Sequence, residues 1–227
     1  MDIFGRRLMD ADFDSDFYRS IDDDEVMGAL AYVKRWAEEY SEDSNGFYIA
    51  SYNPGRCKTS LLACVYNRFT KNSYSVDATN VYEMLSQSRS SRYREAPVLL
   101  IDDIGINAFS GYKGDEENAV LYEIINARYN NNLTTCFTSN YTFQQLAEDR
   151  GILKQTVDRI KGLTAGNWIT IKGDSIRSNK DLSKIEKSLG SDAVKCSHNI
   201  IPAQSMRAKE YLEEKRAERR KLSVEVR

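Results

Sequence analysis

Residues 52–59 read Tyr52-Asn53-Pro54-Gly55-Arg56-Cys57-Lys58-Thr59 and directly follow the short apolar run Gly46–Ala50. A buried strand, a short loop, and a lysine and threonine that open an apolar helix are the context of a phosphate-binding loop. In such a loop the backbone N–H groups and the helix N-terminus surround the phosphates. We expect Lys58 to reach the β- and γ-phosphates and the Thr59 hydroxyl to ligate Mg²⁺.

The loop departs from the usual pattern, G-x-x-x-x-G-K-[ST], at both glycines. Tyr52 stands at the first glycine position and Cys57 at the last, while Gly55 supplies one flexible backbone position. A side chain at the last position crowds the phosphates and demands a costly backbone geometry. The alternative is an ordinary strand-to-helix connection whose lysine faces water. If the loop binds nucleotide, the contacting residues are Asn53, Pro54, Gly55, Arg56, Cys57, Lys58, Thr59 and Ser60.

A second stretch, Val98-Leu99-Leu100-Ile101-Asp102-Asp103, places two carboxylates at the end of a buried strand. In an open α/β sheet, ligands bind at the carboxyl ends of the strands. Ionised carboxylates beside apolar residues cost free energy unless a cation or hydrogen-bond donors face them, and Mg²⁺ is such a cation. We expect Asp102 to hold the metal and Asp103, on the other side of the pleat, to orient the attacking water. The alternative is that one of the two caps a following helix.

A third stretch, Thr138-Ser139-Asn140, ends the apolar strand predicted over Leu133–Thr138. An asparagine at a strand end can hydrogen-bond a γ-phosphate or the attacking water. The alternative for Asn140 is a residue that only begins a turn.

The rest of the chain alternates between helical and extended patterns, with a capping box at Thr142 and Gln145. This alternation predicts an α/β fold with a mostly parallel sheet flanked by helices. Helices are predicted over Asp24–Tyr40, Thr59–Thr70, Asn80–Ser88, Glu116–Tyr129 and Gly151–Ile160, and strands over Gly46–Ala50, Ser73–Asp77, Pro97–Asp102, Leu133–Thr138 and Trp168–Ile171.

Composition excludes several classes of protein. The 227 residues suffice for one well-packed domain with appendages, and no apolar run is long enough to span a membrane. The four cysteines lie far apart, and the single histidine, His198, argues against a histidine-based catalytic triad. The N-terminus lacks the apolar segment of a secretory signal, so a reducing cytoplasm is the expected location.

The net charge is −2, and the two ends of the chain differ in sign. Asp10–Glu25 holds eight acidic residues and one arginine, whereas Arg207–Lys221 holds seven basic residues and four glutamates. One interpretation is that both ends are solvated tails. We predict an acidic N-terminal arm (1–23), a core (24–177) and a polar C-terminal extension with a charged helix (178–227).

The ordered set of motifs resembles the AAA+ ATPase core of bacterial helicase loaders of the DnaC/DnaI type, with the transposition helper IstB close by. The resemblance covers about Glu25 to Arg177. It rests on Asn53–Thr59 followed by Leu61-Leu62-Ala63, on Leu99–Gly105, Asn126–Tyr129 and Thr138–Asn140, and on Val157–Ile160 and Gly173–Arg177.

The resemblance implies a P-loop NTPase core of the AAA+/ASCE class that binds ATP and Mg²⁺. It implies that Asp102 ligates Mg²⁺, that Asp103 is the catalytic carboxylate and that Asn140 is sensor 1. It also implies that Arg159 is an arginine finger directed at a neighbouring subunit and that Arg177 is sensor 2. The implied partners are a replicative helicase, single-stranded DNA and further copies of the chain in an ATP-dependent oligomer.

The replaced glycines leave two other functions open. One is a hydrolysis-deficient adaptor or inhibitor that acts on the helicase or its loader, and the other is an IstB-like transposition helper. ATPase activity is accordingly expected to be weak at most. Retention of Lys58, Thr59, Asp102, Asp103, Asn140, Arg159 and Arg177 favours the nucleotide-dependent loader.

Overall fold

The computed structural model describes residues 4–87, 91–106, 109 and 111–176. Contacts divide the chain into a compact unit that ends at Ser175 and a second unit, Ile176–Arg227, of which only Ile176 is described. Arg177 and the predicted charged helix of the C-terminal extension therefore lie outside the described residues. The boundaries at residues 24 and 177 stay predictions.

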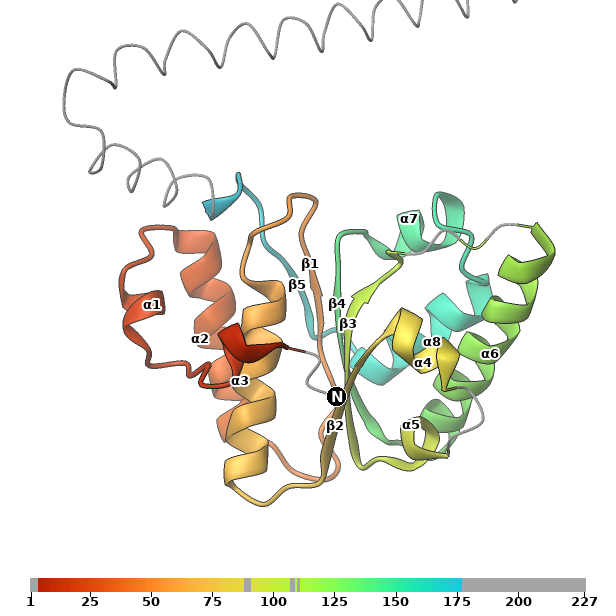
Figure 1. Ribbon diagram of the computed structural model, residues 1–227, viewed down its shortest axis with the longest axis horizontal. Coiled ribbons are helices and arrows are strands. Elements are labelled where there is room, and N and C mark those ends of the chain that lie inside the picture. Colours follow the sequence, from red (N-terminus) through yellow and green to blue (C-terminus); the bar gives the residue numbers. More distant parts are fainter. Residues whose placement is uncertain (1–3, 88–90, 107–108, 110, 177–227) are drawn as a thin grey trace, which may run out of the picture. The chain divides into compact units, whose positions relative to one another are not determined.

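The core of the first unit is a five-stranded sheet in the order β2-β3-β4-β1-β5 (Figure 1). Each neighbouring pair of strands is parallel, which confirms the predicted α/β class. Strand β4 lies between β1, which leads into the phosphate-binding loop, and β3, which carries the carboxylates. The strands are β1 Tyr48–Ala50, β2 Val76–Asn80, β3 Val98–Ile104, β4 Thr134–Ser139 and β5 Trp168–Thr170.

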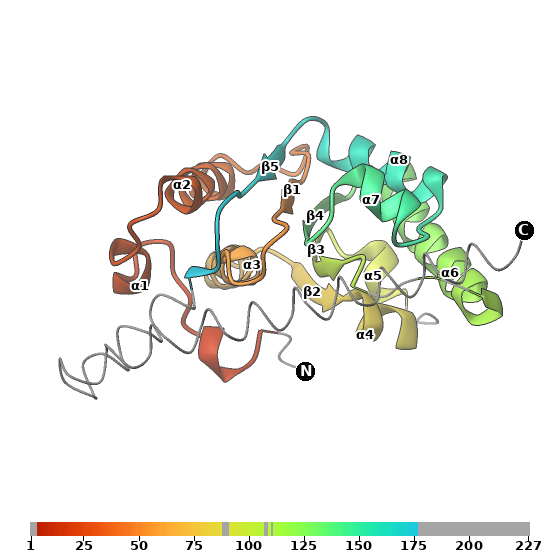
Figure 2. The same ribbon diagram turned by 90° about the horizontal axis from the view of Figure 1, so that it is seen from above.

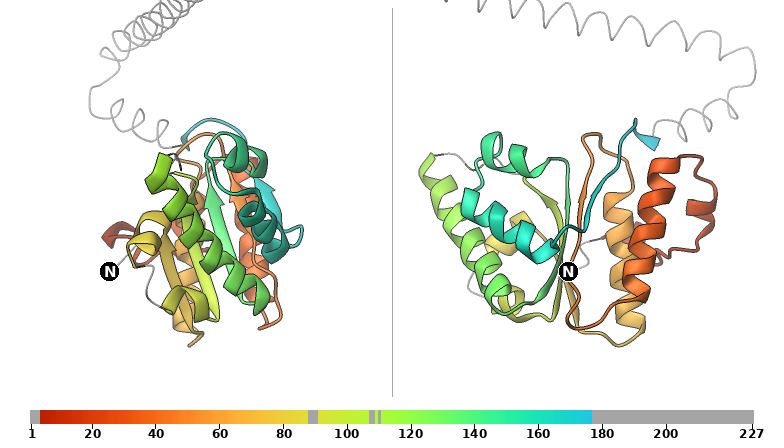
Figure 3. Two further views of the ribbon diagram at one scale, coloured as in Figure 1. Left: turned by 90° about the vertical axis from the view of Figure 1, so that its right-hand side faces the viewer. Right: turned by 180° about the vertical axis from the view of Figure 1, so that it is seen from behind.

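Helices cover both faces of the sheet (Figures 2 and 3). One face carries α2 (Asp24–Glu38) and α3 (Lys58–Lys71), with the 3-10 helix η1 (Arg6–Leu8) and α1 (Asp16–Arg19) on the same side. The other face carries α4 (Val81–Ser86), α5 (Arg92–Glu95), α6 (Gly111–Asn130), α7 (Phe143–Glu148) and α8 (Lys154–Thr164).

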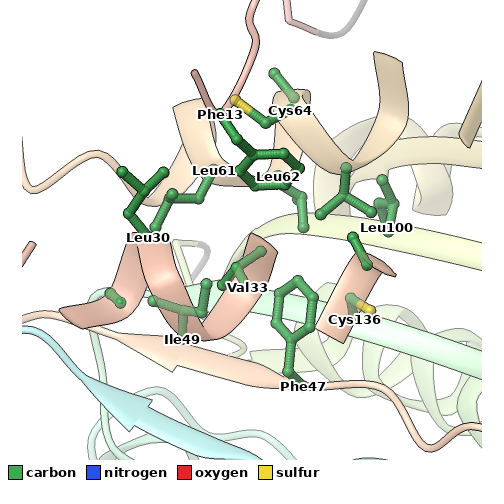
Figure 4. Close-up of a cluster of buried hydrophobic side chains, with 14 of the residues drawn as sticks. Phe13, Leu30, Val33, Phe47, Ile49, Leu61, Leu62, Cys64, Leu100 and Cys136 are labelled. Atoms are coloured by element: carbon green, nitrogen blue, oxygen red, sulfur yellow. The ribbon is translucent and has the colours of Figure 1, made fainter. Parts of the chain in front are cut away.

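Two hydrophobic clusters fill the space between the sheet and these helices. Side chains alternate along a strand, so Val98 and Leu100 join the cluster under α2 and α3, whereas Leu99 and Ile101 join the cluster under α4, α6 and α8. Figure 4 shows the first cluster, in which Leu100 faces Leu62 of α3. A continuous apolar run such as 98–101 is needed because β3 is buried on both faces.

The acidic N-terminal segment packs against the core. Phe4, Phe13 and Tyr18 are buried in the cluster that includes α2 and α3. Asn67 of α3 donates hydrogen bonds from Nδ2 to the carbonyl oxygens of Leu8 and Ala11, at 3.2 and 2.9 Å. The interpretation of this end as a solvated tail is therefore wrong, because three aromatic side chains anchor it among exposed aspartates.

Several element boundaries differ from the prediction. Strand β2 begins three residues later than expected, α6 begins at Gly111 instead of Glu116, and the short helix α5 was missed. The capping box at Thr142 and Gln145 is confirmed. Within the described part of the chain, every helix is too short or too polar to span a bilayer.

Candidate functional site

The candidate site lies where three neighbouring strands end at their carboxyl ends, as expected for an open parallel sheet. The loop 51–57 follows β1, Asp102 and Asp103 lie at the end of β3, and Asn140 follows β4. Because β4 lies between the other two strands, Asn140 comes between the loop and the carboxylates. Residues separated by about 80 positions in sequence are thereby brought into contact.

The loop adopts left-handed backbone conformations at two positions. Gly55 has φ 79° and Cys57 has φ 61° with ψ 7°, so a cysteine occupies a region that favours glycine. Cys57 is the N-cap of α3, and its side chain accepts no capping hydrogen bond from the first turn. The geometry expected for this position is therefore present, and its energetic cost stays a prediction. Tyr52, at the first glycine position, is 59% exposed.

Replacing Cys57 with glycine is expected to raise the free energy of unfolding by about 0.5–1 kcal/mol. A non-glycine residue in the left-handed region costs about 1–2 kcal/mol, and the extra flexibility of unfolded glycine offsets about half of this. Urea unfolding of Cys57→Gly and Cys57→Val measures the effect. The β-branched valine should lower the unfolding free energy, and a destabilised Cys57→Gly would contradict the strain argument.

Two side chains of the loop tie it to distant backbone. Asn53 donates from Nδ2 to the carbonyl oxygen of Gly173 at 2.8 Å. Arg56 is 1% exposed and binds Asp23, the N-cap of α2, through both terminal nitrogens, at 2.6 and 2.8 Å. Arg56 also donates to the carbonyl oxygens of Lys172 and Asp174. The Arg56 guanidinium is thus engaged within the protein, and only its backbone is available for the ligand contact that the sequence predicted.

Lys58 lies at the start of α3 and points toward the end of β4. Its Nζ donates to Asn140 Oδ1 at 2.7 Å and to the carbonyl oxygen of Ser51 at 3.4 Å. Lys58 is 6% exposed, so the alternative of a lysine that faces water is wrong. Two residues predicted to face the same phosphate are therefore in direct contact.

Asp102 is buried and accepts two hydroxyl hydrogen bonds. Its Oδ1 accepts from Thr59 Oγ1 at 3.2 Å and from Thr138 Oγ1. Burial, and next the charge of Asp103, raise the pKa of Asp102, while the two hydroxyls and Lys58 act in the opposite direction. A divalent cation at this position would stabilise the ionised carboxylate.

The end of β3 is irregular. The register with β4 shifts between Ile101 and Ile104, and Asp103 has φ 53°. The backbone N–H of Asp103 donates to Thr138 Oγ1 at 2.9 Å in place of a ladder hydrogen bond. Simple pleat alternation therefore does not describe the two carboxylates. The alternative of a helix N-cap is wrong, since the first described helix after Asp103 is α6, which begins at Gly111.

The donor set fits Mg²⁺ and a triphosphate. Thr59 Oγ1 and Asp102 Oδ1 are hard oxygen ligands whose positions, 3.2 Å apart, suit neighbouring ligands on one small cation. Lys58 and the first turn of α3 supply the positive charge and N–H groups that phosphates require. Among the described residues no group of three or more His, Cys, Asp or Glu gathers as a metal site, so a cation here would need ligands from nucleotide or water.

Replacing Asp102 with asparagine is expected to stabilise the nucleotide-free protein while abolishing the effect of Mg²⁺ on nucleotide binding. The pKa of the Asp102 carboxyl is raised by folding from its ordinary value of 3.8. Ionisation of this carboxyl therefore destabilises the folded protein as the pH rises above 3.8. At pH 7 the melting temperature of Asp102→Asn should therefore exceed that of the wild type. The gain should vanish below pH 3.8, whereas the exposed Asp158→Asn control should show neither effect.

Arg159 lies on α8 and its described contacts are on the α6 side. Its Nε donates to Asn126 Oδ1 at 3.2 Å, and its guanidinium carbon lies 4.5 Å from the ring centroid of Tyr129. These two contacts and its ion pair with Asp158 involve neither Lys58 nor Asp102. The structure therefore does not bring Arg159 to the site of its own chain.

Of the remaining predicted ligands, Pro54 is exposed in the loop and Ser60 is half-buried in the first turn of α3.

Sequence reasoning missed the parts played by Thr138 and Ser139. The Thr138 hydroxyl joins the Asp102 carboxylate to the Asp103 N–H, and Ser139 Oγ donates to the carbonyl oxygen of Ile104 at 2.7 Å. Both side chains are fully buried. The available signal was two hydroxyl residues in succession at the end of an otherwise apolar strand.

Comparison with known proteins finds similarity to a helicase loader. The replicative helicase loader DnaI of Bacillus subtilis (strain 168) is 25% identical over 138 residues, which are 56% of this chain and 43% of that protein. This chain thus aligns with less than half of the length of that relative. No family model matches the sequence.

Two solved structures share the fold. A crystal structure of DnaI matches with a TM-score of 0.58 and 26% identity, over 75% of this chain and 92% of that one. DnaA from Aquifex aeolicus, bound to the nucleotide analogue AMPPCP, matches with a TM-score of 0.67 and 16% identity, over 88% and 71%. The AAA+ P-loop fold predicted from the sequence is confirmed, and the resemblance to the DnaC/DnaI type is confirmed with it.

Proposed function

Because this chain has the AAA+ P-loop fold and is related to the DnaC/DnaI-type helicase loaders, we propose that it is an ATP-binding loader of a replicative helicase. One observation carries the proposal. Lys58, Thr59, Asp102 and Asn140, from three separate elements, converge through hydrogen bonds at one end of the sheet.

Different residues of the site bind the phosphates and the metal of Mg-ATP. The loop N–H groups and Lys58 receive the phosphates, and Thr59 and Asp102 hold Mg²⁺. A metal held by these two residues would offset the negative charge of the phosphates. Asp103 and Asn140 face the γ-phosphate, which distinguishes ATP from ADP. The present contact between Lys58 and Asn140 is one that the γ-phosphate would replace by offering oxygens to both.

Loading requires that the nucleotide state reach partners outside the site. We assign Arg159 to the γ-phosphate of a neighbouring copy, because its guanidinium lies at a half-exposed position on α8 and its described contacts lie outside the cluster around Lys58. Such a finger makes self-assembly dependent on ATP. The replicative helicase and single-stranded DNA are the partners that this function requires, and basic residues gripping the DNA backbone would make DNA binding sensitive to salt.

A second candidate is an adaptor that binds nucleotide without hydrolysing it. The left-handed Cys57, at the position where a glycine usually meets the phosphates, is the observation that favours it. An adaptor would associate with the helicase equally well with ATP and with ADP.

The decisive experiment measures association with the host replicative helicase in the presence of Mg-ATP, Mg-ADP or no nucleotide. We expect retention of helicase with Mg-ATP by the wild type, and loss of this nucleotide effect in Lys58→Ala. Equal retention under all three conditions would favour the adaptor.

Arg159→Ala should bind Mg-ATP normally and fail to assemble in size-exclusion chromatography. Unchanged assembly would remove the role assigned to Arg159. If the wild type binds Mg-ATP no better than Lys58→Ala does, the proposed function is wrong.

A further inference from the structure

The last residues of β3 are connected to the end of β4 by side chains after the regular ladder stops. The Thr138 hydroxyl accepts from the Asp103 N–H, and the Ser139 hydroxyl donates to the carbonyl oxygen of Ile104. The next two carbonyl oxygens, those of Gly105 and Ile106, are bound by Arg150, which lies between α7 and α8. Every residue from 103 to 106 is thus held by a hydrogen bond to Thr138, Ser139 or Arg150.

Arg150 makes these contacts with a geometry that only arginine provides. Its Nε donates to the carbonyl oxygen of Gly105 and its Nη2 to that of Ile106, each at 2.6 Å. Its guanidinium carbon also lies 4.7 Å from the ring centroid of Tyr141. A planar group with several donors in a fixed fork can serve two successive carbonyls and stack on a ring, whereas lysine cannot do all three.

Tyr141 directly follows Asn140 and is itself fixed. Its N–H donates to Ser139 Oγ at 3.0 Å, and its carbonyl oxygen accepts from the Tyr48 hydroxyl of β1 at 2.6 Å. Arg150 therefore joins the residue that follows Asn140 to the two residues that shortly follow Asp103.

Residue 105 can lie this close to Leu146 and Tyr141 because it is a glycine. This residue has φ 89°, and a Cβ at its position would lie 2.5 Å from Leu146 Cδ2 and 3.1 Å from Tyr141 Cδ2. The N–H of Ile106 donates to the carbonyl oxygen of Asp103 at 3.1 Å, which closes a turn that begins at Asp103. By holding the far side of this turn, Arg150 restricts where Asp103 can lie relative to Asn140.

We propose that Arg150 is a positioning residue that gives the site its preference for ATP over ADP. This inference rests on the proposed function, in which Asp103 and Asn140 face the γ-phosphate. ADP lacks that phosphate, so a displacement of Asp103 relative to Asn140 weakens ATP binding and leaves ADP binding intact. A residue that only stabilised the fold would weaken the binding of both nucleotides or of neither.

The test measures dissociation constants for Mg-ADP and for a non-hydrolysable Mg-ATP analogue by calorimetry. The wild type should prefer the ATP analogue. Arg150→Lys should reduce that preference by about tenfold, the loss expected for one hydrogen bond to a charged group, with ADP binding within about twofold of wild type. Arg92→Lys is the matched control, because Arg92 also stacks on a tyrosine, at 5.7 Å from Tyr93, but pairs with Asp77 of β2.

Each outcome decides the inference. An unchanged preference in Arg150→Lys, or an equal loss of both affinities, overturns it while leaving the proposed function intact. A wild type that binds neither nucleotide better than Lys58→Ala overturns the proposed function and the inference together. If Arg150→Lys does not fold, Tyr141→Leu, which removes only the ring under the guanidinium, should show the same selective loss, and Tyr141→Phe should restore it.

Discussion

Replacing Asp23 with asparagine is expected to lower the free energy of unfolding by about 3 kcal/mol at pH 7. Asparagine keeps the acceptor for the Val26 N–H, so the helix cap survives and only the charge is lost. The loss leaves the Arg56 guanidinium, 1% exposed, facing two backbone carbonyls without its carboxylate partner. Breaking a buried ion pair from one side costs about 3–5 kcal/mol, and we take the lower figure because the Asp23 side chain is 23% exposed.

The dependence of unfolding free energy on pH tests whether the charge of Asp23 causes this loss. The Arg56 hydrogen bond, above all, lowers the pKa of Asp23 below its ordinary value of 3.8. A depressed pKa contributes stability that is fully present above pH 3.8 and is lost as the pH falls through the folded-state pKa. The difference between wild type and Asp23→Asn in urea unfolding should therefore shrink below pH 3.8. A difference that stayed constant down to pH 2 would show that the charge is not its cause.

The same pair should matter for nucleotide binding. Arg56 belongs to the phosphate-binding loop and holds it against the N-cap of α2 and the segment 172–174. An added Cβ at Gly173 would lie 3.0 Å from Arg56 Nη2, so the segment approaches the guanidinium as closely as glycine permits. Arg56→Lys, which cannot reach all these acceptors, should weaken nucleotide binding even at temperatures where the variant remains folded.

The second large effect is expected at Arg128, which is fully buried. Its guanidinium donates to the carbonyl oxygens of Tyr93, Ala96 and Thr134 and to Thr135 Oγ1, and thereby joins α5, α6 and β4. Burial lowers its pKa to about 10, so it remains charged at neutral pH. Arg128→Met keeps much of the side-chain volume and removes the donors that Arg128 supplies to three buried carbonyls.

Arg128→Met is expected to lower the unfolding free energy by about 3 kcal/mol or more, since each unsatisfied buried acceptor costs about 1–3 kcal/mol. The corresponding fall in melting temperature is about 6–12 °C for a domain of this size. Arg35→Met is the control, because Arg35 is 76% exposed in its pair with Glu39 and should change stability by less than about 0.5 kcal/mol. A loss at Arg128 no larger than that at Arg35 would contradict the account.

Arg56 and Arg128 also show which contacts the sequence does not predict. Lys58, Thr59, Asp102 and Asn140 are recognisable because each stands at a fixed offset from an apolar run, and strand ends converge in a parallel sheet. Arg56 and Arg128 follow no such rule. Arg56 contacts Asp23, which is 33 positions away, and Asp174, which is 118 positions away. Neither contact produces a local sequence pattern.

The same limit explains the other differences. Fixed spacing predicted that Asp102 and Asp103 would end a strand, but the register shift beside them depends on hydroxyls that β4 supplies. The N-terminal segment looked solvated because its aspartates outnumber its aromatic residues. Phe4, Phe13 and Tyr18 are too widely spaced to show periodicity, and only their burial among residues of α2 and α3 shows that they anchor the segment.

The strand order has a consequence for how the protein is made. Strand β1 pairs with β4 and β5 alone, so during synthesis it has no partner until residues 134–139 have left the ribosome. The contacts of Arg56 with Lys172 and Asp174 require a still longer chain. Pairing across such separations is slow to form. The phosphate-binding loop therefore cannot form its full set of contacts until residues up to Asp174 have emerged.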